Sequence, residues 1–316
     1  SKINNHTYID KICFKNNNVT MKQILCSFLI VLLFSSCVVF RIGDLATSSI
    51  LDETDPLLVE ESLPAFIKTV EILYRDNPSN ETNAKTLASL YLLYSNMILG
   101  TKAFLLQNTD PLESSKISSR ANTYAIKAKN IMLPFITKKS PKLFSSQINI
   151  TALNDKSTQK LVSMFTKKDT TLLYTAVASI FAVFSGNPLD FETANLIPAA
   201  LLLLDRALQL DPYGENGRIL TLAYSVYAGM PETLGGDKNK ALDYFEKARM
   251  YYSETNAGLY VDYALLFALP LNDKDLFLKN ITHAIDIAQK KQNLMNMLAM
   301  QKAAAIQADI YLYFTD

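Results

Sequence analysis

The sequence has few of the residue types that most often carry out covalent chemistry. Its 316 residues include three cysteines, two histidines and no tryptophan. Cys13 and Cys26 lie upstream of Cys37, and His283 is the one histidine after Cys37. An enzyme without a cofactor usually needs a histidine or a close pair of acids. We therefore expect that this protein is not an enzyme.

Motifs that hold metals, cofactors or phosphates are also missing. The sequence contains no HExxH, no calcium-loop spacing, no G-x-S-x-G and no glycine-rich phosphate loop. Paired acids do occur, as Glu60 with Glu61 and Asp273 with Asp275, but they stand where helices are expected to begin. A negative charge at that end complements the helix dipole. We predict no cofactor and no metal site.

The charge balance argues against a nucleic-acid partner. The net charge is +1, and the first 36 residues contribute four lysines and one aspartate. Once they are removed, the rest of the chain has a net charge of about −2. Binding to DNA or RNA needs a positive field, which this chain does not supply.

The segment after Met21 has the layout of a secretory signal peptide. Lys22 is followed by an uncharged, largely apolar run of eleven residues, Ile24 to Phe34, and then by two serines and Cys37. A helix of eleven residues spans about 17 Å, too short for a hydrocarbon core of about 30 Å. The serines and cysteine resemble a relaxed lipobox, which predicts cleavage before Cys37 and lipid attachment to it. The alternative is an ordinary signal peptide with an incidental cysteine.

These signals divide the chain into four parts. We expect an upstream extension over 1–20, a lipoprotein signal peptide over 21–36, a polar tether over 37–56 and a helical domain over 57–316. With its cysteines discarded or lipidated, the mature protein has no thiol pair to form a disulfide. The expected location is the periplasm, with the lipid on Cys37 as the membrane anchor.

Helical periodicity dominates the predicted domain, whereas no sustained alternation of apolar and polar residues indicates strands. Glycine and proline are scarce, at nine and eleven residues, and they cluster between periodic segments. Asp237 and Asp273 are predicted N-caps. The fold class is therefore predicted to be all-α. Helices are expected over residues 60–76, 82–108, 113–133, 155–167, 170–185, 191–210, 216–229, 238–252, 256–268, 273–290 and 293–314.

Several of these helices share the spacing of a tetratricopeptide repeat (TPR). Its second helix has small residues flanking a larger one, and three segments match in full and one in part. The matches are Ala121/Ala125/Ala128, Ala200/Leu204/Ala207, Ala241/Phe245/Ala248 and the partial Ala284/Ala288. Two first helices also fit, with Leu220/Ala223/Tyr224/Tyr227 and Tyr260/Tyr263/Ala264/Phe267.

The repeats depart from the regular 34-residue period. The second helices begin 79, 41 and 43 residues apart. We interpret them as degenerate TPR-like repeats with inserted helices around 155–185. The alternative is an irregular helical bundle with alanine where helices cross.

Aromatic residues are abundant despite the absence of tryptophan, with 16 tyrosines and 16 phenylalanines. Stacked helices bury many of them, but tyrosine also brings a polar tip that suits a ligand-binding wall. An aromatic-lined channel and a purely structural core both stay open. The residues predicted to line a channel are Tyr224, Tyr227, Tyr260, Tyr263, Phe267, Phe181 and Phe184.

Two adjoining runs resemble a known family. The sequence MPETLGGD at 230–237, followed by KALDYFEKA at 240–248, is similar to the signature of TatT, the TPR-containing T component of TRAP (tripartite ATP-independent periplasmic) transporters. The segments 91–94 and 207–212 agree with that family as well. The loop residues predicted to form a partner surface are Pro231, Glu232, Leu234, Gly235, Gly236 and Asp237.

The resemblance implies a function in solute uptake. It implies a homotrimer that associates with the periplasmic solute-binding protein (the P component), and a hydrophobic channel for a small apolar ligand that carries an acid group. It implies no catalytic residues. One alternative is a TPR scaffold that binds extended peptide during outer-membrane protein assembly. A lipid-processing enzyme would need a base, and His283 is its one candidate.

Overall fold

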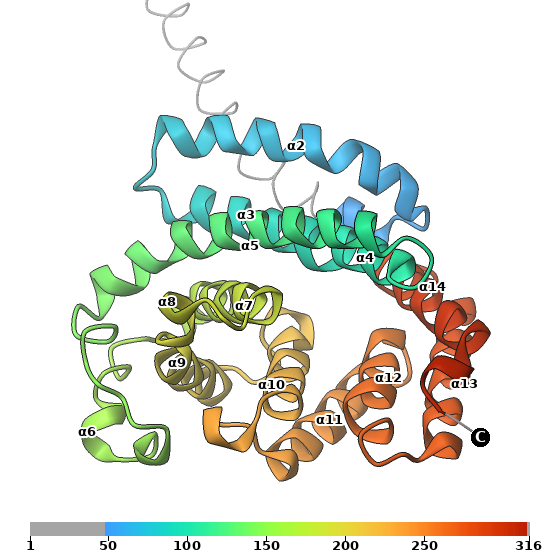
Figure 1. The fold of residues 1–316 in the computed structure, drawn as a ribbon. Coiled ribbons are helices and arrows are strands. Elements are labelled where there is room, and N and C mark those ends of the chain that lie inside the picture. Colours follow the sequence, from blue (N-terminus) through green and yellow to red (C-terminus); the bar gives the residue numbers. More distant parts are fainter. Residues whose placement is uncertain (1–47, 315–316) are drawn as a thin grey trace, which may run out of the picture. The chain divides into compact units, whose positions relative to one another are not determined.

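The computed structural model describes residues 48–314 of the chain (Figure 1). Every element named below belongs to the unit of residues 52–316. The predicted extension, the signal peptide, Cys37 and most of the tether lie outside the described residues. The described part of the chain contains helices and turns without strands, which confirms the all-α fold class.

The helices follow one another with short connections. In chain order they are α2 (Pro56–Asp76), α3 (Glu81–Leu92), the π-helical η1 (Leu93–Leu99), α4 (Gly100–Leu106), α5 (Pro111–Lys139), α6 (Lys156–Gln159), α7 (Thr170–Gly186), α8 (Phe191–Ala194) and α9 (Ile197–Leu210). They continue with α10 (Arg218–Gly229), α11 (Lys238–Tyr252), α12 (Ala257–Tyr263), the π-helical η6 (Ala264–Ala268), α13 (Lys274–Lys290) and α14 (Leu294–Ala308).

Side-chain capping sets several of these starting points. Asp237 accepts hydrogen bonds from the backbone N–H groups of Asn239 and Lys240, and Asp273 accepts one from Leu276. Both predicted N-caps are confirmed. Each carboxylate satisfies N–H groups that have no partner within the first turn, which stabilises a helix by about 1 kcal/mol.

The predicted helix over 155–167 is wrong for most of its length, because only 156–159 is helical there. The carbonyl of Leu161 accepts a 2.7 Å hydrogen bond from Ser140 Oγ, and that of Phe165 accepts one from Arg206 Nη2 at 2.6 Å. Carbonyls held by distant side chains stabilise a turn in place of a helical ladder. The sequence does not reveal these partners, since Ser140 follows α5 and Arg206 belongs to α9.

Three other boundaries differ from the prediction. The helix expected to end at 133 continues through Pro134 to Lys139 and stops before Pro141. The helix expected over 191–210 is divided into α8 and α9, with Pro198 in the first turn of α9. Proline favours that position because its missing N–H would have no helical partner there. The last helix ends at Ala308, ahead of a short 3-10 turn.

Consecutive helices pack as antiparallel pairs, and small residues lie where they cross. α3 and α4 pack on α5, α7 packs on α9, α10 on α11 and α12 on α13. The alanines of the proposed repeat spacing at 125, 128, 200, 207, 241, 248, 284 and 288 are buried, whereas Ala121 is half-buried. α7, which covers much of the segment predicted as inserted, packs against both α5 and α9. The assignment of the pairs as TPR repeats stays a prediction.

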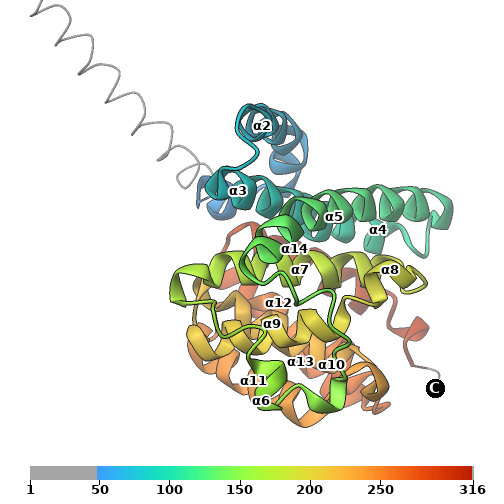
Figure 2. The ribbon, with the colours of Figure 1, turned by 90° about the vertical axis from the view of Figure 1, so that its left-hand side faces the viewer.

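The last helix returns to the first ones. α14 packs against α12 and α13 and also contacts α4, η1 and α2 (Figures 1 and 2). Helices from both ends of the unit therefore meet.

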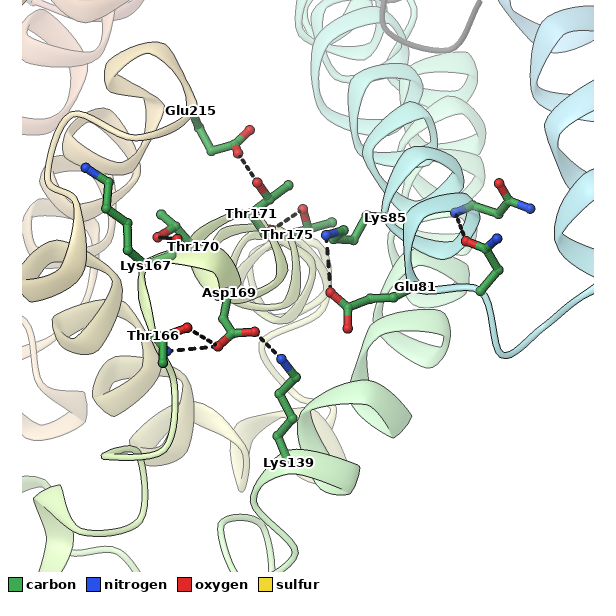
Figure 3. A network of polar contacts seen from close by, with 12 residues as sticks. Glu81, Lys85, Lys139, Thr166, Lys167, Asp169, Thr170, Thr171, Thr175 and Glu215 are labelled. Carbon is green, nitrogen blue, oxygen red and sulfur yellow. Dashed lines mark hydrogen bonds and ion pairs between the residues drawn. The ribbon is translucent and has the colours of Figure 1, made fainter. Parts of the chain in front are cut away.

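Polar contacts tie the middle helices together (Figure 3). Asp169, just before α7, accepts a 2.8 Å hydrogen bond from the Thr166 N–H and forms an ion pair with Lys139 at the end of α5. Thr171 Oγ1 donates a 2.6 Å hydrogen bond to Glu215 in the connection between α9 and α10. These contacts fix α7 between its neighbours.

Among the described residues, one helix is long and apolar enough to span a membrane by length and composition, at Lys167–Gly186. In its most apolar window, 67% is buried inside the protein. A core helix of a packed domain meets the same criteria.

Candidate functional site

Five aromatic rings meet where α10 and α11 pack together with α12 and its π-helical continuation η6. Phe245 lies at the centre, with its ring centroid 4.4 Å from Tyr263, 5.5 Å from Tyr224 and 6.0 Å from Tyr260. Phe267 completes the group by stacking on Tyr224 at 6.0 Å and on Tyr263 at 5.4 Å. We call these five residues the aromatic cluster.

The structure brings four of the seven predicted channel residues into the aromatic cluster. Tyr224, Tyr260 and Phe267 are buried there, whereas Tyr263 is half-buried. Phe245, which connects them, was predicted as a repeat residue and not as a channel residue. The sequence did contain a signal for its central position. Phe245 is the large middle residue of the Ala241/Phe245/Ala248 spacing, and that residue fills the gap between two helices.

The other three predicted channel residues lie elsewhere. Tyr227 stacks on Tyr244 at 5.8 Å, and its hydroxyl donates a 2.6 Å hydrogen bond to Asp205 on α9. Phe181 and Phe184 belong to α7, with Phe181 buried and Phe184 half-buried, and neither contacts a ring of the aromatic cluster.

Polar residues flank the aromatic cluster in sequence, since Ser225 follows Tyr224 on α10 and Asp262 precedes Tyr263 on α12. Ser225 Oγ donates to Asp262 Oδ2 at 3.5 Å. The ammonium group of Lys302 lies 5.9 Å from the centroid of the Phe104 ring on α4. Asp262 and Lys302 are both half-buried and do not form an ion pair with each other. We call Tyr224, Ser225, Asp262 and Lys302 the polar cluster.

Burial dominates the electrostatics of the polar cluster. It raises the pKa of Asp262, although the charge of Lys302 and the Ser225 hydrogen bond act in the opposite direction. It lowers the pKa of Lys302, against the attraction of Asp262. Burial also raises the pKa of Tyr224, whose hydroxyl has no hydrogen-bond partner among the described residues. Groups that lose water without full pairing are costly and often mark functional sites.

The sequence interpretation missed Asp262 and Lys302. Each is the one charged residue in an otherwise uncharged helical segment, over 257–268 and 294–308 respectively. That pattern was the signal that could have identified them, since a lone charge within an apolar helix often faces a buried polar group.

The loop between α10 and α11 contains the eight-residue run that carries the family resemblance. A side chain at Gly236 would place its Cβ 1.9 Å from the Met230 carbonyl oxygen, and one at Gly235 would lie 2.4 Å from Leu201. Gly235 also has a φ of +97°, which favours glycine. Gly236 is therefore required by its close approach to backbone, and Gly235 by its positive φ.

The predicted partner residues of this loop divide into two groups. Pro231 and Glu232 are exposed, whereas Leu234, the two glycines and Asp237 are half-buried. Asp237 caps α11, and its own N–H donates a 3.0 Å hydrogen bond to the Tyr227 carbonyl. The half-buried residues therefore fix the conformation of the loop, and Pro231 and Glu232 face solvent.

His283 lies at the surface beside Tyr260. Its ring makes an edge contact with Tyr260 at 4.5 Å, and its Nε2 pairs with Glu254. Glu254 also accepts a 2.9 Å hydrogen bond from the Tyr260 hydroxyl. The His283 ring thus packs on Tyr260, and its Nε2 faces a carboxylate. No group of three metal-binding side chains occurs within residues 48–314.

Comparison with known proteins resolves the family. The model of a family described as TRAP transporter T-component matches residues 52–314. The chain belongs to this family. A protein of Treponema pallidum (strain Nichols), described as uncharacterized, is 26% identical over 287 residues, covering 87% of this chain and 86% of its own length. Membership in the T-component family confirms the resemblance and assigns a role in TRAP transport, because the family is a transporter component and not an enzyme family.

Proposed function

We propose that this T component docks the solute-binding protein of a TRAP transporter and takes part in the uptake of a small hydrophobic acid. The observation that carries the proposal is the family match across residues 52–314, which is nearly the whole helical unit. The T component would hold the binding protein near the membrane, and its interior would give an apolar ligand a path shielded from water.

The docking surface follows from the up-and-down arrangement of the helices. Alternate connections in such a stack lie at the same end. The connections within the helix pairs are α4–α5, α7–α8, α10–α11 and α12–α13. Two of them contain a strongly exposed apolar residue, Leu189 at 78% and Leu271 at 65%, and Leu112 at 69% lies in the first turn of α5, next to a third. The fourth is the loop with Pro231 and Glu232.

Exposed apolar side chains at one edge favour a protein partner, since interface centres are depleted in charge and enriched in apolar residues. Phe191, at 78% exposure, follows Leu189 and enlarges the apolar area. The α10–α11 loop is rigid because its glycines are packed and Asp237 is bonded on both sides. Such a preformed loop loses little conformational entropy on binding.

The ligand path is proposed to run along the aromatic and polar clusters. Tyr263 is half-buried, and it stacks on Phe267. The clusters combine apolar rings with hydroxyl and charged groups, the composition expected of a wall that binds an apolar molecule with one polar end. Tyr227 belongs to the neighbouring contact with Asp205 and supports the position of α10.

The anchor and the assembly complete the proposal. Cys37 lies outside the described residues, and its lipidation before the helical unit would place the protein on the periplasmic face of a membrane. The homotrimer is implied by the family resemblance. Incorporation of labelled palmitate, lost in Cys37→Ala, tests the anchor, and light scattering of the purified protein tests the trimer.

Binding between the purified T component and its genomic partner, the solute-binding protein, tests the docking claim. Glu232→Lys combined with Pro231→Ala should weaken the complex by about tenfold or more, as expected when contacts near the centre of an interface are lost. Glu61→Lys, on the exposed part of α2, is the matched charge control and should bind as the unmodified protein does. Equal binding by all three proteins would remove the loop from the interface.

A further inference from the structure

The connection between α5 and α7 differs in length and charge from the other connections within residues 56–308. It covers residues 140–169, whereas none of the others is longer than eight residues. Together with the last two residues of α5 it contains seven lysines and two aspartates, a net charge of +5, although the chain after residue 36 totals about −2. We call residues 138–169 the lysine segment. Connections of this length are uncommon in compact domains and are often functional.

The lysine segment is packed firmly against the rest of the unit. Its apolar side chains Val162 and Phe165 are fully buried. Arg206 of α9 donates a 2.6 Å hydrogen bond to the carbonyl of Phe165, and Lys167 forms an ion pair with Asp211 at the end of α9 at 3.2 Å. The segment therefore presents its charges from a preformed surface, which loses little conformational entropy on binding.

Most lysines of this segment are not neutralised by a carboxylate. On α11, by contrast, Lys247 pairs with Asp243 one helical turn away, at 2.6 Å. Within the lysine segment, Lys139 and Lys167 pair with aspartates that fix the fold. Five further lysines are exposed and form no ion pair within residues 48–314, namely Lys138, Lys142, Lys156, Lys160 and Lys168. Their charges consequently add up to a positive surface.

This surface fits anionic lipid headgroups better than an acidic protein. The centres of protein interfaces are depleted in lysine and enriched in arginine. The arginine beside this segment, Arg206, is already bonded to backbone carbonyls. Lysine carries a compact charge on a flexible stem and is attracted to an anionic membrane surface without needing a fixed partner. Met164 is 44% exposed within the same segment and supplies an apolar side chain that a membrane interface accommodates.

We propose that the lysine segment binds anionic headgroups at the membrane surface and thereby orients the protein on it. The inference rests on the proposed membrane anchor and adds the face that meets the lipid. The predicted tether over 37–56 reaches about 60 Å when fully extended, more than the length of about 43 Å of α5, the longest described helix. A lipid on Cys37 alone therefore leaves many orientations open. The lysine segment, whose α6 lies on the other side of the unit from α2 (Figure 1), selects one of them.

Partition of the full chain between water and lipid vesicles tests the proposal. Cys37→Ala removes the site of lipidation, so the measurement does not depend on the anchor. Vesicles of phosphatidylcholine are compared with vesicles that contain phosphatidylcholine and phosphatidylglycerol in equal amounts. The ratio of the two partition coefficients isolates the effect of charge, because apolar segments contribute equally to both. This ratio should favour the anionic vesicles and should decrease when salt is added.

A triple variant removes part of the positive surface. It combines Lys142→Gln, Lys156→Gln and Lys160→Gln, all at exposed positions. A lysine near an anionic surface strengthens binding by about fivefold, so the ratio should fall by about tenfold or more.

The matched control removes three exposed lysines at another surface. It combines Lys279→Gln, Lys290→Gln and Lys291→Gln, on α13 and directly after it. The net charge of the whole protein changes equally in the two triple variants. The control should therefore lower the ratio by less than about twofold, because charges farther than a Debye length from the membrane are screened.

Two results of the vesicle measurement would overturn the proposal. They are equal partition into the two kinds of vesicle, and equal decreases of the ratio in the two triple variants. Docking of the solute-binding protein is measured on the same preparations. Docking that is lost in the lysine-segment variant while its vesicle partition is unchanged would assign this surface to an acidic protein instead. Absent docking combined with charge-dependent partition would refute the docking function and leave this inference in place.

Discussion

The hydroxyl of Tyr227 donates a 2.6 Å hydrogen bond to Asp205 and so joins α10 to α9. The tyrosine ring is buried, and its stacking on Tyr244 leaves the hydroxyl pointed at one acceptor. Tyr227, which was predicted to line a ligand channel, thus connects the α10–α11 pair to the α7–α9 pair.

Removing this hydroxyl should reduce stability without changing the shape of the core. Tyr227→Phe loses a hydrogen bond to a charged group, so the free energy of unfolding should fall by about 1.5–3 kcal/mol, as measured by urea denaturation. Tyr251→Phe, at an exposed tyrosine, should change it by less than about 0.5 kcal/mol. An equal decrease in the free energy of unfolding in the two variants would show that the hydrogen bond to Asp205 does not stabilise the fold.

Gly236 should tolerate no side chain. In Gly236→Ala the new Cβ would overlap the Met230 carbonyl oxygen, so the loop must shift, and the free energy of unfolding should fall by about 3 kcal/mol or more. Gly229→Ala is the matched control, because its Cβ would lie 3.8 Å from Leu266 in ordinary contact. Alanine favours a helix there, so that variant should be as stable or slightly more stable.

The central ring of the aromatic cluster should contribute strongly to stability. Phe245→Ala leaves a cavity between α10, α11 and α12, which should lower the free energy of unfolding by about 3–5 kcal/mol. Phe245→Leu retains most of the volume and should lose clearly less, as measured by the same denaturation. Similar losses for alanine and leucine would contradict the packing described for Phe245.

Asp169 should make the free energy of unfolding depend on pH. Burial alone would raise the pKa of Asp169, but hydrogen bonds from Lys139 and Thr166 outweigh it and hold the pKa below its ordinary value of 3.8. The ionised carboxylate therefore stabilises the fold at neutral pH, and this contribution is lost as the pH falls through the lowered pKa.

Urea denaturation from pH 7 down to about pH 2 measures this contribution. Asp169→Asn should be less stable at neutral pH by about 1–3 kcal/mol and should lose less stability on acidification. Asp155→Asn is the control, because that exposed carboxylate caps no N–H group. A parallel acid dependence in Asp169→Asn and the unmodified protein would refute the assignment.

Local sequence signals predicted much of the fold because local physics determines it. α11 begins and ends where its periodicity and the Asp237 cap place it, at residues 238–252. The helix predicted over 155–167 was wrong because backbone carbonyls of that segment accept hydrogen bonds from Ser140 and Arg206, which are distant in sequence. Periodicity contains no information about such partners.

The candidate site was predicted in part for the same reason. Tyr224, Tyr260 and Phe267 share one helical spacing pattern, so their convergence on neighbouring helices was visible in the sequence. The approach of Asp262 to Lys302 depends on how α14 packs against α12, and the contact of Lys302 with Phe104 depends on α14 reaching α4. No spacing within any of these helices predicts those contacts.

Docking between the T component and the solute-binding protein is the most direct test of the function proposed here. The two purified proteins are mixed, and their complex is measured by surface plasmon resonance with the T component immobilised. We predict a saturable complex that Glu232→Lys with Pro231→Ala weakens by about tenfold or more and that Glu61→Lys leaves unchanged. The absence of any saturable binding between the two unmodified proteins would contradict the account.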